Sequence, residues 1–297
     1  MNEDFIARML CDDLNVRACA AITLGISNGL ARMHGATPAA ALALSRTATA
    51  AALMSATLKP GSDQTVSVRI SGTGPIREIH VQADAKGHLR GYAGNPGAHS
   101  DLSVSGLSIS GLIGAGTLTV IKDLGLKEPY SSVQPLVRGE VAHDIAHYLT
   151  FSEQVPSALI IGTALEPDGA FSASGGILIQ GLPGTAPEAL VTIEENIGAM
   201  KTSLGERLRQ GADIYTVTGE LLGDRALELL ESSKLELACR CNRELLARII
   251  VGLPAHEIED LLRRDRGIEL TCTFCTTRYR FDEREVRTLM SAGNRVP

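Results

Sequence analysis

The sequence lacks the long apolar run that a membrane-spanning helix requires. Its least polar stretch, residues 37–58, contains Arg46 and several serines and threonines, whereas a span needs about 20 predominantly apolar residues. We expect no secretory leader either, because acids stand where a leader has basic residues and the next apolar segment is broken by Asp12 and Asp13. These absences predict a cytoplasmic protein that does not engage a membrane.

An excess of positive charge is also absent. The formal net charge is -6, and residues 236–297 carry eleven arginines, no lysine and ten acids, a net of +1. Binding to nucleic acid needs a basic surface that meets the phosphates. We therefore expect no general affinity for nucleic acid.

Signatures of nucleotide binding and of common hydrolases are missing. The glycine-rich residues 111–116 fit neither the dinucleotide fingerprint nor the phosphate loop, so ATP is not expected as a ligand. No G-x-S-x-G motif occurs. His143 and His147 have the spacing of a zinc-protease motif, but Asp144 replaces its glutamate and no third ligand is evident. We interpret this pair as an exposed helix face and expect the protein not to be an enzyme.

The first 182 residues mix strand and helix patterns and predict an α+β core domain with a largely antiparallel sheet and packed helices. Thr37 and Pro38 suit the start of a helix that runs to about Leu58, and a second helix is expected over residues 140–151. Short runs of β-branched or alternating residues are separated by turn residues. They predict strands at 65–71, 76–83, 89–93, 117–121, 133–137, 158–165 and 170–180.

A boundary is expected at Leu182-Pro183-Gly184, after which residues 183–235 form a helical linker. From Lys201 to Lys234, eleven of 34 residues are charged and Tyr215 is the only aromatic residue. Such a segment buries little apolar surface of its own, so we expect marginal stability. Its best helix is predicted from Gly219 to Ser232.

The last part, residues 236–297, is predicted to be a small separate domain. Asn242 suits the start of one helix, and a second helix follows around residues 258–262. Strands are expected at 268–270 and 278–281. Asp282 and Glu285 have the spacing of a capping box for a final helix that Gly293 would end.

Two close cysteine pairs are the strongest chemical signal. Cys239-Arg-Cys241 is followed after thirty residues by Cys272-Thr-Phe-Cys275. Cytoplasmic thiols stay reduced, and zinc prefers four tetrahedral thiolate or imidazole ligands, so the pairs predict one four-cysteine zinc site in the small domain. The two-residue spacing of the first pair also suits a local disulfide. We assign no role to Cys11 and Cys19.

Zinc bound by thiolates would make this domain sensitive to oxidants. Apparent zinc-binding free energies of about 10–16 kcal/mol are folding free energy in small zinc domains, and a domain of this size is marginal without metal. Thiolates are open to oxidation, disulfides would expel the metal, and cytoplasmic reductants would reverse the change. Four arginines are expected to place positive charge near the sulfurs: Arg240, Arg243, Arg278 and Arg280.

Other interpretations remain open from the residues alone. The cysteines could form a purely structural zinc ribbon in a nucleic-acid-binding or scaffold protein, although the nearly neutral tail counts against nucleic acid. They could be four unrelated buried thiols, which the paired spacing disfavours. A thiol oxidoreductase that uses Cys272 and Cys275 would need a thioredoxin-like βαβ setting, which the tail lacks.

Taken with blocks of residues along the whole chain, the cysteine pattern resembles the heat shock protein 33 family of redox-regulated chaperones. The most specific part joins Cys239-x-Cys241 to Cys272-x-Phe274-Cys275-x-x-x-Tyr279-x-Phe281. Earlier blocks that resemble the family are Val16-Arg17, His34, Leu58-Lys59, Gly72-x-Gly74-Pro75, Leu89-Arg90-Gly91-Tyr92, Gly114-x-Gly116-x-Leu118, Tyr130, Ser152-Glu153-Gln154-x-Pro156 and Gly175-Gly176-x-Leu178-x-Gln180-x-Leu182-Pro183. Ser131-Ser132 stands where a Gln-Gly pair is frequent in the family, and Cys11 and Cys19 are additions.

The resemblance implies a stress-responsive chaperone that is inactive while one zinc ion is bound to four reduced cysteines. Oxidation would form the disulfides Cys239–Cys241 and Cys272–Cys275, release zinc, unfold the tail and the adjacent linker, and favour a homodimer. The activated form would hold unfolded or partly unfolded client proteins without ATP. In this scheme residues 201–234 are the metastable linker.

Overall fold

The computed structural model describes residues 3–100 and 107–293. The chain divides into two compact units, Met1–Ala238 and Cys239–Pro297. Residues 183–238 therefore pack with the preceding part of the chain in the first unit. No helix in the described ranges is long and apolar enough to cross a bilayer.

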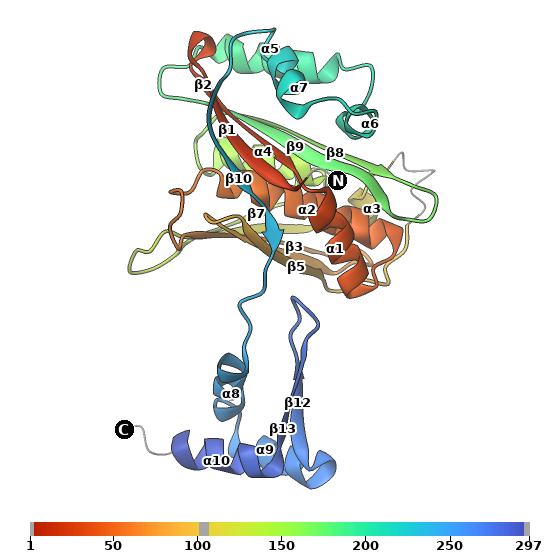
Figure 1. Ribbon diagram of the computed structural model, residues 1–297, viewed down its shortest axis with the longest axis vertical. Helices are drawn as coiled ribbons and strands as arrows, with labels where there is room; N and C mark the ends of the chain where they lie inside the picture. Colours follow the sequence, from red (N-terminus) through yellow and green to blue (C-terminus); the bar gives the residue numbers. More distant parts are fainter. Residues whose placement is uncertain (1–2, 101–106, 294–297) are drawn as a thin grey trace. The chain divides into compact units, whose positions relative to one another are not determined.

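Two sheets form the framework of the first unit (Figure 1). Sheet A is antiparallel throughout, and sheet B is antiparallel except where β11 pairs with β5. Sheet A, in the order β10-β1-β2-β9-β8, contains β1 (Phe5–Cys11), β2 (Val16–Ile22), β8 (Ser157–Leu165), β9 (Phe171–Gly181) and β10 (Glu228–Lys234). Sheet B, in the order β11-β5-β4-β3-β6-β7, contains β3 (Thr65–Gly72), β4 (Glu78–Asp84), β5 (His88–Ala93), β6 (Gly116–Asp123), β7 (Tyr130–Pro135) and β11 (Glu236–Leu237).

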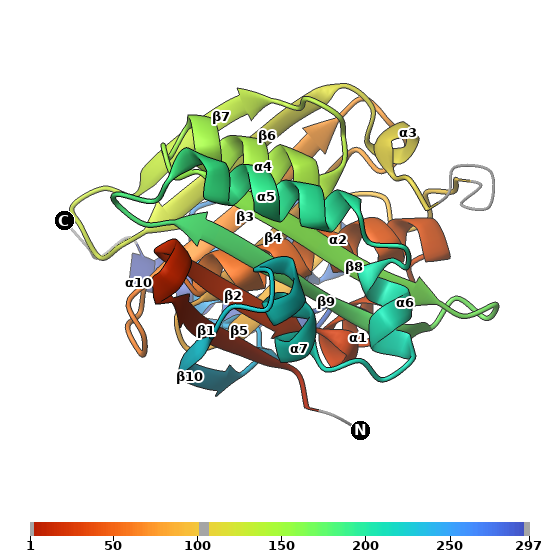
Figure 2. The same cartoon turned by 90° about the horizontal axis from the view of Figure 1, so that it is seen from above.

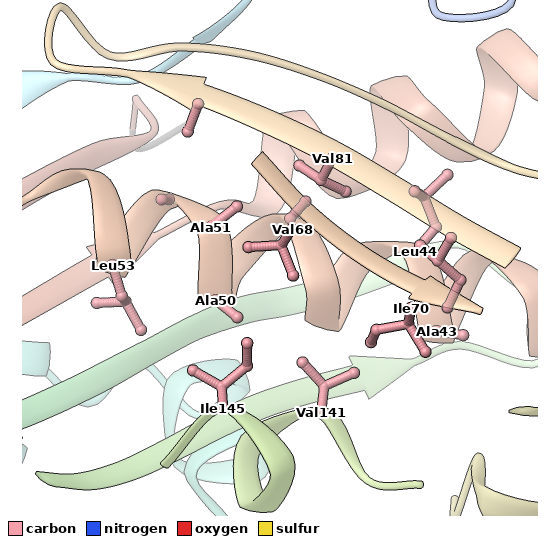
Figure 3. Packing of buried hydrophobic residues seen from close by; sticks show 14 of the residues in the cluster. Ala43, Leu44, Ala50, Ala51, Leu53, Val68, Ile70, Val81, Val141 and Ile145 are labelled. Carbon is pink, nitrogen blue, oxygen red and sulfur yellow. The ribbon is translucent and has the colours of Figure 1, made fainter. Parts of the chain in front are cut away.

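The main core surrounds helix α2 (Pro38–Ser55), which contacts strands of both sheets. Every α2 residue except Pro38 and Arg46 is buried, and its many alanines let strands approach closely. The predicted cap is confirmed, since the Thr37 hydroxyl accepts from the Ala40 N–H. Figure 3 shows the α2 alanines among side chains of β3, β4 and helix α4 (Val141–Phe151). Helices α1 (Leu24–His34) and α3 (Ser110–Ile113) complete this core.

A second apolar core lies on the other face of sheet A. Three helices of the expected linker cover that face: α5 (Pro187–Gly198), α6 (Leu204–Arg209) and α7 (Ile214–Leu221) (Figure 2). Helix α6 approaches the sheet most closely, because a Cβ added to Gly205 would lie 2.4 Å from the Thr163 carbonyl oxygen. The helices of the predicted linker thus form a layer over the sheet, and the α+β class is confirmed.

The predicted helix from Gly219 to Ser232 is wrong. Helix α7 ends at Leu221, Gly223 and Asp224 have positive φ angles of 70° and 57°, and residues 228–234 pair with β1 as strand β10. Pairing with a sheet edge outweighs helix propensity here, since local propensity is a weak preference. Strand β7 also begins and ends earlier than the predicted strand at 133–137, and β1 and β2 had no predicted counterpart.

The second unit follows its predicted order closely. It contains α8 (Arg243–Val251), α9 (Ala255–Asp265), β12 (Gly267–Thr271), β13 (Arg278–Asp282) and α10 (Glu283–Gly293). The Asn242 side chain caps α8 by accepting from the Leu245 N–H. The capping box is confirmed, because the Glu285 carboxylate accepts from the Asp282 N–H and the Asp282 carboxylate accepts from the Glu285 N–H.

Candidate metal centre

Two short chain segments carry the four cysteines of the second unit. Cys239 and Cys241 lie between β11 and the cap of α8. Cys272 and Cys275 lie in the turn of the β12–β13 hairpin, where the Cys272 backbone bonds to Thr276 and Thr277 and Thr276 takes a positive φ of 57°. The hairpin turn therefore directs both of its sulfurs to one end of the ribbon.

The four sulfurs gather into one cluster. All four Sγ atoms lie within 4.8 Å of one another. The Sγ atoms of Cys239 and Cys272 are 3.7 Å apart, and those of Cys241 and Cys275 are 3.2 Å apart. Zinc–sulfur bonds of ~2.3 Å in a tetrahedron place sulfurs about 3.8 Å apart. The cluster can therefore hold a metal ion of this type with small adjustments, and none of the four cysteines is in a disulfide.

The ionisation of these thiols is uneven without a cation. Burial and hydrogen bonds with the other three thiols raise the pKa of Cys241 to about 12, although the Tyr279 hydroxyl opposes this shift. Burial also opposes ionisation of Cys275, but hydrogen bonds with Thr277 and neighbouring thiols outweigh it and lower its pKa to about 6. A bound divalent cation would favour all four thiolates, because metal ligation and deprotonation are linked.

Two polar side chains beside the cysteines were not anticipated as parts of the site. The Tyr279 hydroxyl lies 3.3 Å from the Cys241 sulfur, and the Thr277 hydroxyl lies 3.3 Å from the Cys275 sulfur. Partners of this kind orient metal ligands and tune their basicity. Thr277 lies two residues after Cys275 and Tyr279 four residues after it. Alternate residues of a strand point to the same side, so this even spacing is the signal that could have identified both side chains.

The arginines have more varied positions than the sequence suggested. Arg243 lies over the Phe281 ring at 4.3 Å, and its Nη2 donates to Glu285 at 2.6 Å and to the Arg280 carbonyl. Arg278 lies 4.0 Å from Glu269. Arg243 is therefore committed to the packing of α8, β13 and α10, and its predicted role in offsetting thiolate charge is not supported by these contacts.

The apolar core of the second unit is small. The buried apolar side chains that form it are Leu246, Ile250, Ile258, Leu262, Ile268, Phe281 and Val286. Domains of about sixty residues bury a modest fraction of their surface and are marginal without a further source of stability. The cysteine cluster lies where a metal ion would supply that stability.

The remaining candidate residues do not assemble into a second centre. The four-cysteine cluster is the only group of potential metal ligands across residues 3–100 and 107–293 that meets the geometric requirement. His143 and His147 lie on α4 as half-buried side chains whose Nδ1 atoms have no hydrogen-bond partner, so the expected exposed face is wrong. Cys11 and Cys19 are buried on opposite faces of sheet A.

Comparison with known proteins gives one consistent result. The model of the family described as "Hsp33 protein" matches residues 4–282. The "33 kDa chaperonin" of Staphylococcus carnosus is 38% identical over 99% of this chain and 100% of its own length. That of Desulforamulus reducens is 35% identical over 97% of both chains.

A solved structure agrees with these relatives. The crystal structure of the 33 kDa chaperonin (heat shock protein 33 homolog) from Thermotoga maritima has a TM-score of 0.88 and 31% sequence identity, and it covers 98% of this chain and 99% of that chain. The resemblance noted in the sequence is thereby confirmed over both units. The chain belongs to the Hsp33 family.

Proposed function

We propose that this protein is an ATP-independent holdase chaperone that is held inactive by one zinc ion and activated by oxidation. The observation that carries the proposal is the gathering of four cysteine sulfurs, none of them in a disulfide, within 4.8 Å in a unit with few buried apolar residues. Its membership of a family whose relatives are named chaperonins supports the chaperone role. The proposal places the protein in the cytoplasm and assigns it no catalytic activity.

Cys239, Cys241, Cys272 and Cys275 are the proposed ligands. Zinc bound there would fix the four thiolates and contribute folding free energy of about 10–16 kcal/mol, as in small zinc domains. Formation of the disulfides Cys239–Cys241 and Cys272–Cys275 removes four electrons, which two molecules of hydrogen peroxide accept as they are reduced to water. The sulfurs must approach to ~2.05 Å in each pair, which destroys the tetrahedral set.

Loss of the metal is expected to unfold the second unit and then the adjacent helical layer. Helices α5, α6 and α7 cover apolar side chains of sheet A that include Met9, Val16, Ala18, Ile177 and Ile179. An exposed apolar area of this kind binds other proteins. We therefore propose unfolded or partly unfolded clients as partners, and a homodimer as the oxidised form.

The test compares reduced and oxidised protein in the same assay. Zinc content and suppression of the aggregation of a heat-labile client are measured before and after peroxide treatment with mild warming. We expect one zinc ion per reduced chain, none after oxidation, and protection of the client by the oxidised form. Equal protection by the zinc-loaded reduced form would refute the switch and favour a structural zinc ribbon.

A further inference from the structure

Residues 228–238, which we call the strap, pass from the edge of sheet A to the edge of sheet B. In β10 they pair antiparallel with β1, with Phe5 opposite Lys234. In β11 they pair parallel with β5, with Glu236 opposite His88. Figure 1 shows β10 lying beside β1. The next residue in the chain is Cys239, so the strap is joined directly to the first cysteine pair.

Backbone hydrogen bonds hold much of the strap. The Leu235 N–H donates to the Asp4 carbonyl, and the Glu236 and Ala238 N–H groups donate to the carbonyls of Gly87 and Leu89, each at 2.9 Å. These bonds need no particular side chain on the strap. An edge that pairs in this way accepts extended segments of many sequences.

The side chains of the strap contribute unevenly. Leu229 and Leu230 are 53% and 56% exposed, whereas Leu235 is 2% exposed. An ion pair joins Arg8 to Glu231. Leu237 packs on α1, where a Cβ added to Gly29 would lie 2.5 Å from its Cδ1 atom. The attachment of β10 to β1 therefore depends mainly on the backbone and on one buried leucine at its end.

Removal of the strap would expose an unpaired edge on β1. Backbone groups alternate in direction along a strand, and the Asp4 carbonyl faces the strap. The N–H and C=O groups of Ile6 and Arg8 therefore face it as well. The outer strands at the other ends of the two sheets, β8 and β7, have no strap of this kind in the described ranges.

We propose that the activated protein binds an extended segment of its unfolding client by strand addition to the edge of β1, in the place that the strap leaves. This inference rests on the proposed holdase function and specifies how a client is held. An unfolded chain has free backbone groups along its length, whereas a native protein has few. Pairing with backbone groups would thus select unfolded proteins without selecting their sequence.

Three labelled peptides with the sequence of residues 227–238 test the proposal against the full-length protein. The first is unmodified. The second is N-methylated at Ser233 and Leu235, whose N–H groups face β1. The third is N-methylated at Ser232 and Lys234, whose N–H groups face away, and it serves as the matched control. Binding is measured by fluorescence anisotropy, and competition is measured by loss of client protection.

We expect the oxidised, zinc-free protein to bind the first and third peptides and the reduced protein to bind none. The second peptide should bind about tenfold or more weakly, as the loss of two backbone hydrogen bonds implies. Only the peptides that bind should reduce client protection.

Equal binding or equal competition by the two methylated peptides, while the oxidised protein still protects its client, would overturn strand addition and leave the holdase function intact. Strand addition by clients would also be overturned if the oxidised protein bound no peptide and formed dimers whose fraction rises with protein concentration. The strap of a second copy would then fill the edge of β1. Failure of the oxidised protein to protect any client would refute the proposed function itself, and this inference with it.

Discussion

The contact between α6 and sheet A provides a way to loosen the helical layer without touching a cysteine. Gly205 packs on β8 so closely that a Cβ there would lie 2.4, 2.5 and 2.6 Å from the O, C and N atoms of Thr163. These neighbours are backbone atoms and cannot turn aside. Gly205→Ala must therefore push α6 away from the sheet.

The size of the effect follows from two opposing contributions. Overpacking costs about 1–3 kcal/mol, and it also disturbs Leu204, which is 1% exposed. Alanine returns up to about 0.5–1 kcal/mol through its better helix propensity. The net loss is therefore at most about 3 kcal/mol, and a loss of about 1–2 kcal/mol, in the middle of the range, would raise the population of undocked α6 roughly five- to thirtyfold.

Hydrogen exchange of residues 187–221 in the reduced, zinc-loaded protein measures this population. We expect faster exchange in Gly205→Ala and earlier activation by peroxide in the aggregation assay. Gly219→Ala on α7 is the matched control, because no atom lies within 4 Å of its added Cβ. That change should stabilise the layer by about 0.4–1 kcal/mol and delay activation.

Unchanged exchange in Gly205→Ala would show that α6 is not held by the observed contact. Faster activation in Gly219→Ala would show that the rate of activation does not depend on the stability of the helical layer. Either result would refute the reasoning that links the packing of these helices to the switch.

Three further predictions concern other parts of the chain. Cys272→Ser should abolish zinc retention at equimolar metal and lower the melting temperature of the second unit, measured by zinc content and calorimetry; retention of one zinc would contradict the proposed ligand set. Leu235→Ser should loosen the strap and allow the labelled strap peptide to bind the reduced protein, because this side chain is buried. Leu230→Ser changes a side chain that is 56% exposed and should not allow binding. Fluorescence anisotropy of the peptide measures both. Burial raises the pKa of Asp4 above its ordinary value of 3.8. Between the pKa of the unfolded state and the higher pKa of the native state, the native state therefore binds more protons. The free energy of unfolding should then fall as the pH rises through this range. Asp4→Asn should remove this dependence of the free energy of unfolding on pH, which urea titrations at several pH values measure. If the free energies of the wild type and the variant fell in parallel as the pH rises, the argument would be wrong.

Local signals in the sequence were sufficient for much of the fold. Thr37 with Pro38, Asn242, and the pair Asp282 and Glu285 are caps that act within one helical turn, and the helices begin where these residues predict. The cysteine spacing and the family resemblance selected the same four residues that the structure brings together. Their role as metal ligands remains a prediction.

The failures arose where distant segments decide the structure. Residues 228–234 form β10 because β1 lies beside them, and β1 is more than two hundred residues away in the chain. No periodicity within the segment reveals that partner. The commitment of Arg243 to Glu285 and Phe281 likewise depends on a helix and a strand that meet only after folding.

In the proposed switch, the separation of Cys11 from Cys19 by sheet A determines which thiol of the first unit is uncovered after oxidation. Cys11 is buried in the core beneath α5–α7 and Cys19 in the core around α2, so sheet A stands between the two sulfurs. Burial also raises the pKa of Cys19 to about 11, which keeps it a poorly reactive thiol. Loss of α5–α7 in the proposed mechanism would uncover Cys11, whereas Cys19 stays in the core around α2 and is kept from exchange with the cysteines of the second unit. In the proposed switch, sheet A therefore keeps Cys19 out of scrambled cross-links, and Cys11 is the thiol of the first unit that the helices must cover again when the disulfides are reduced.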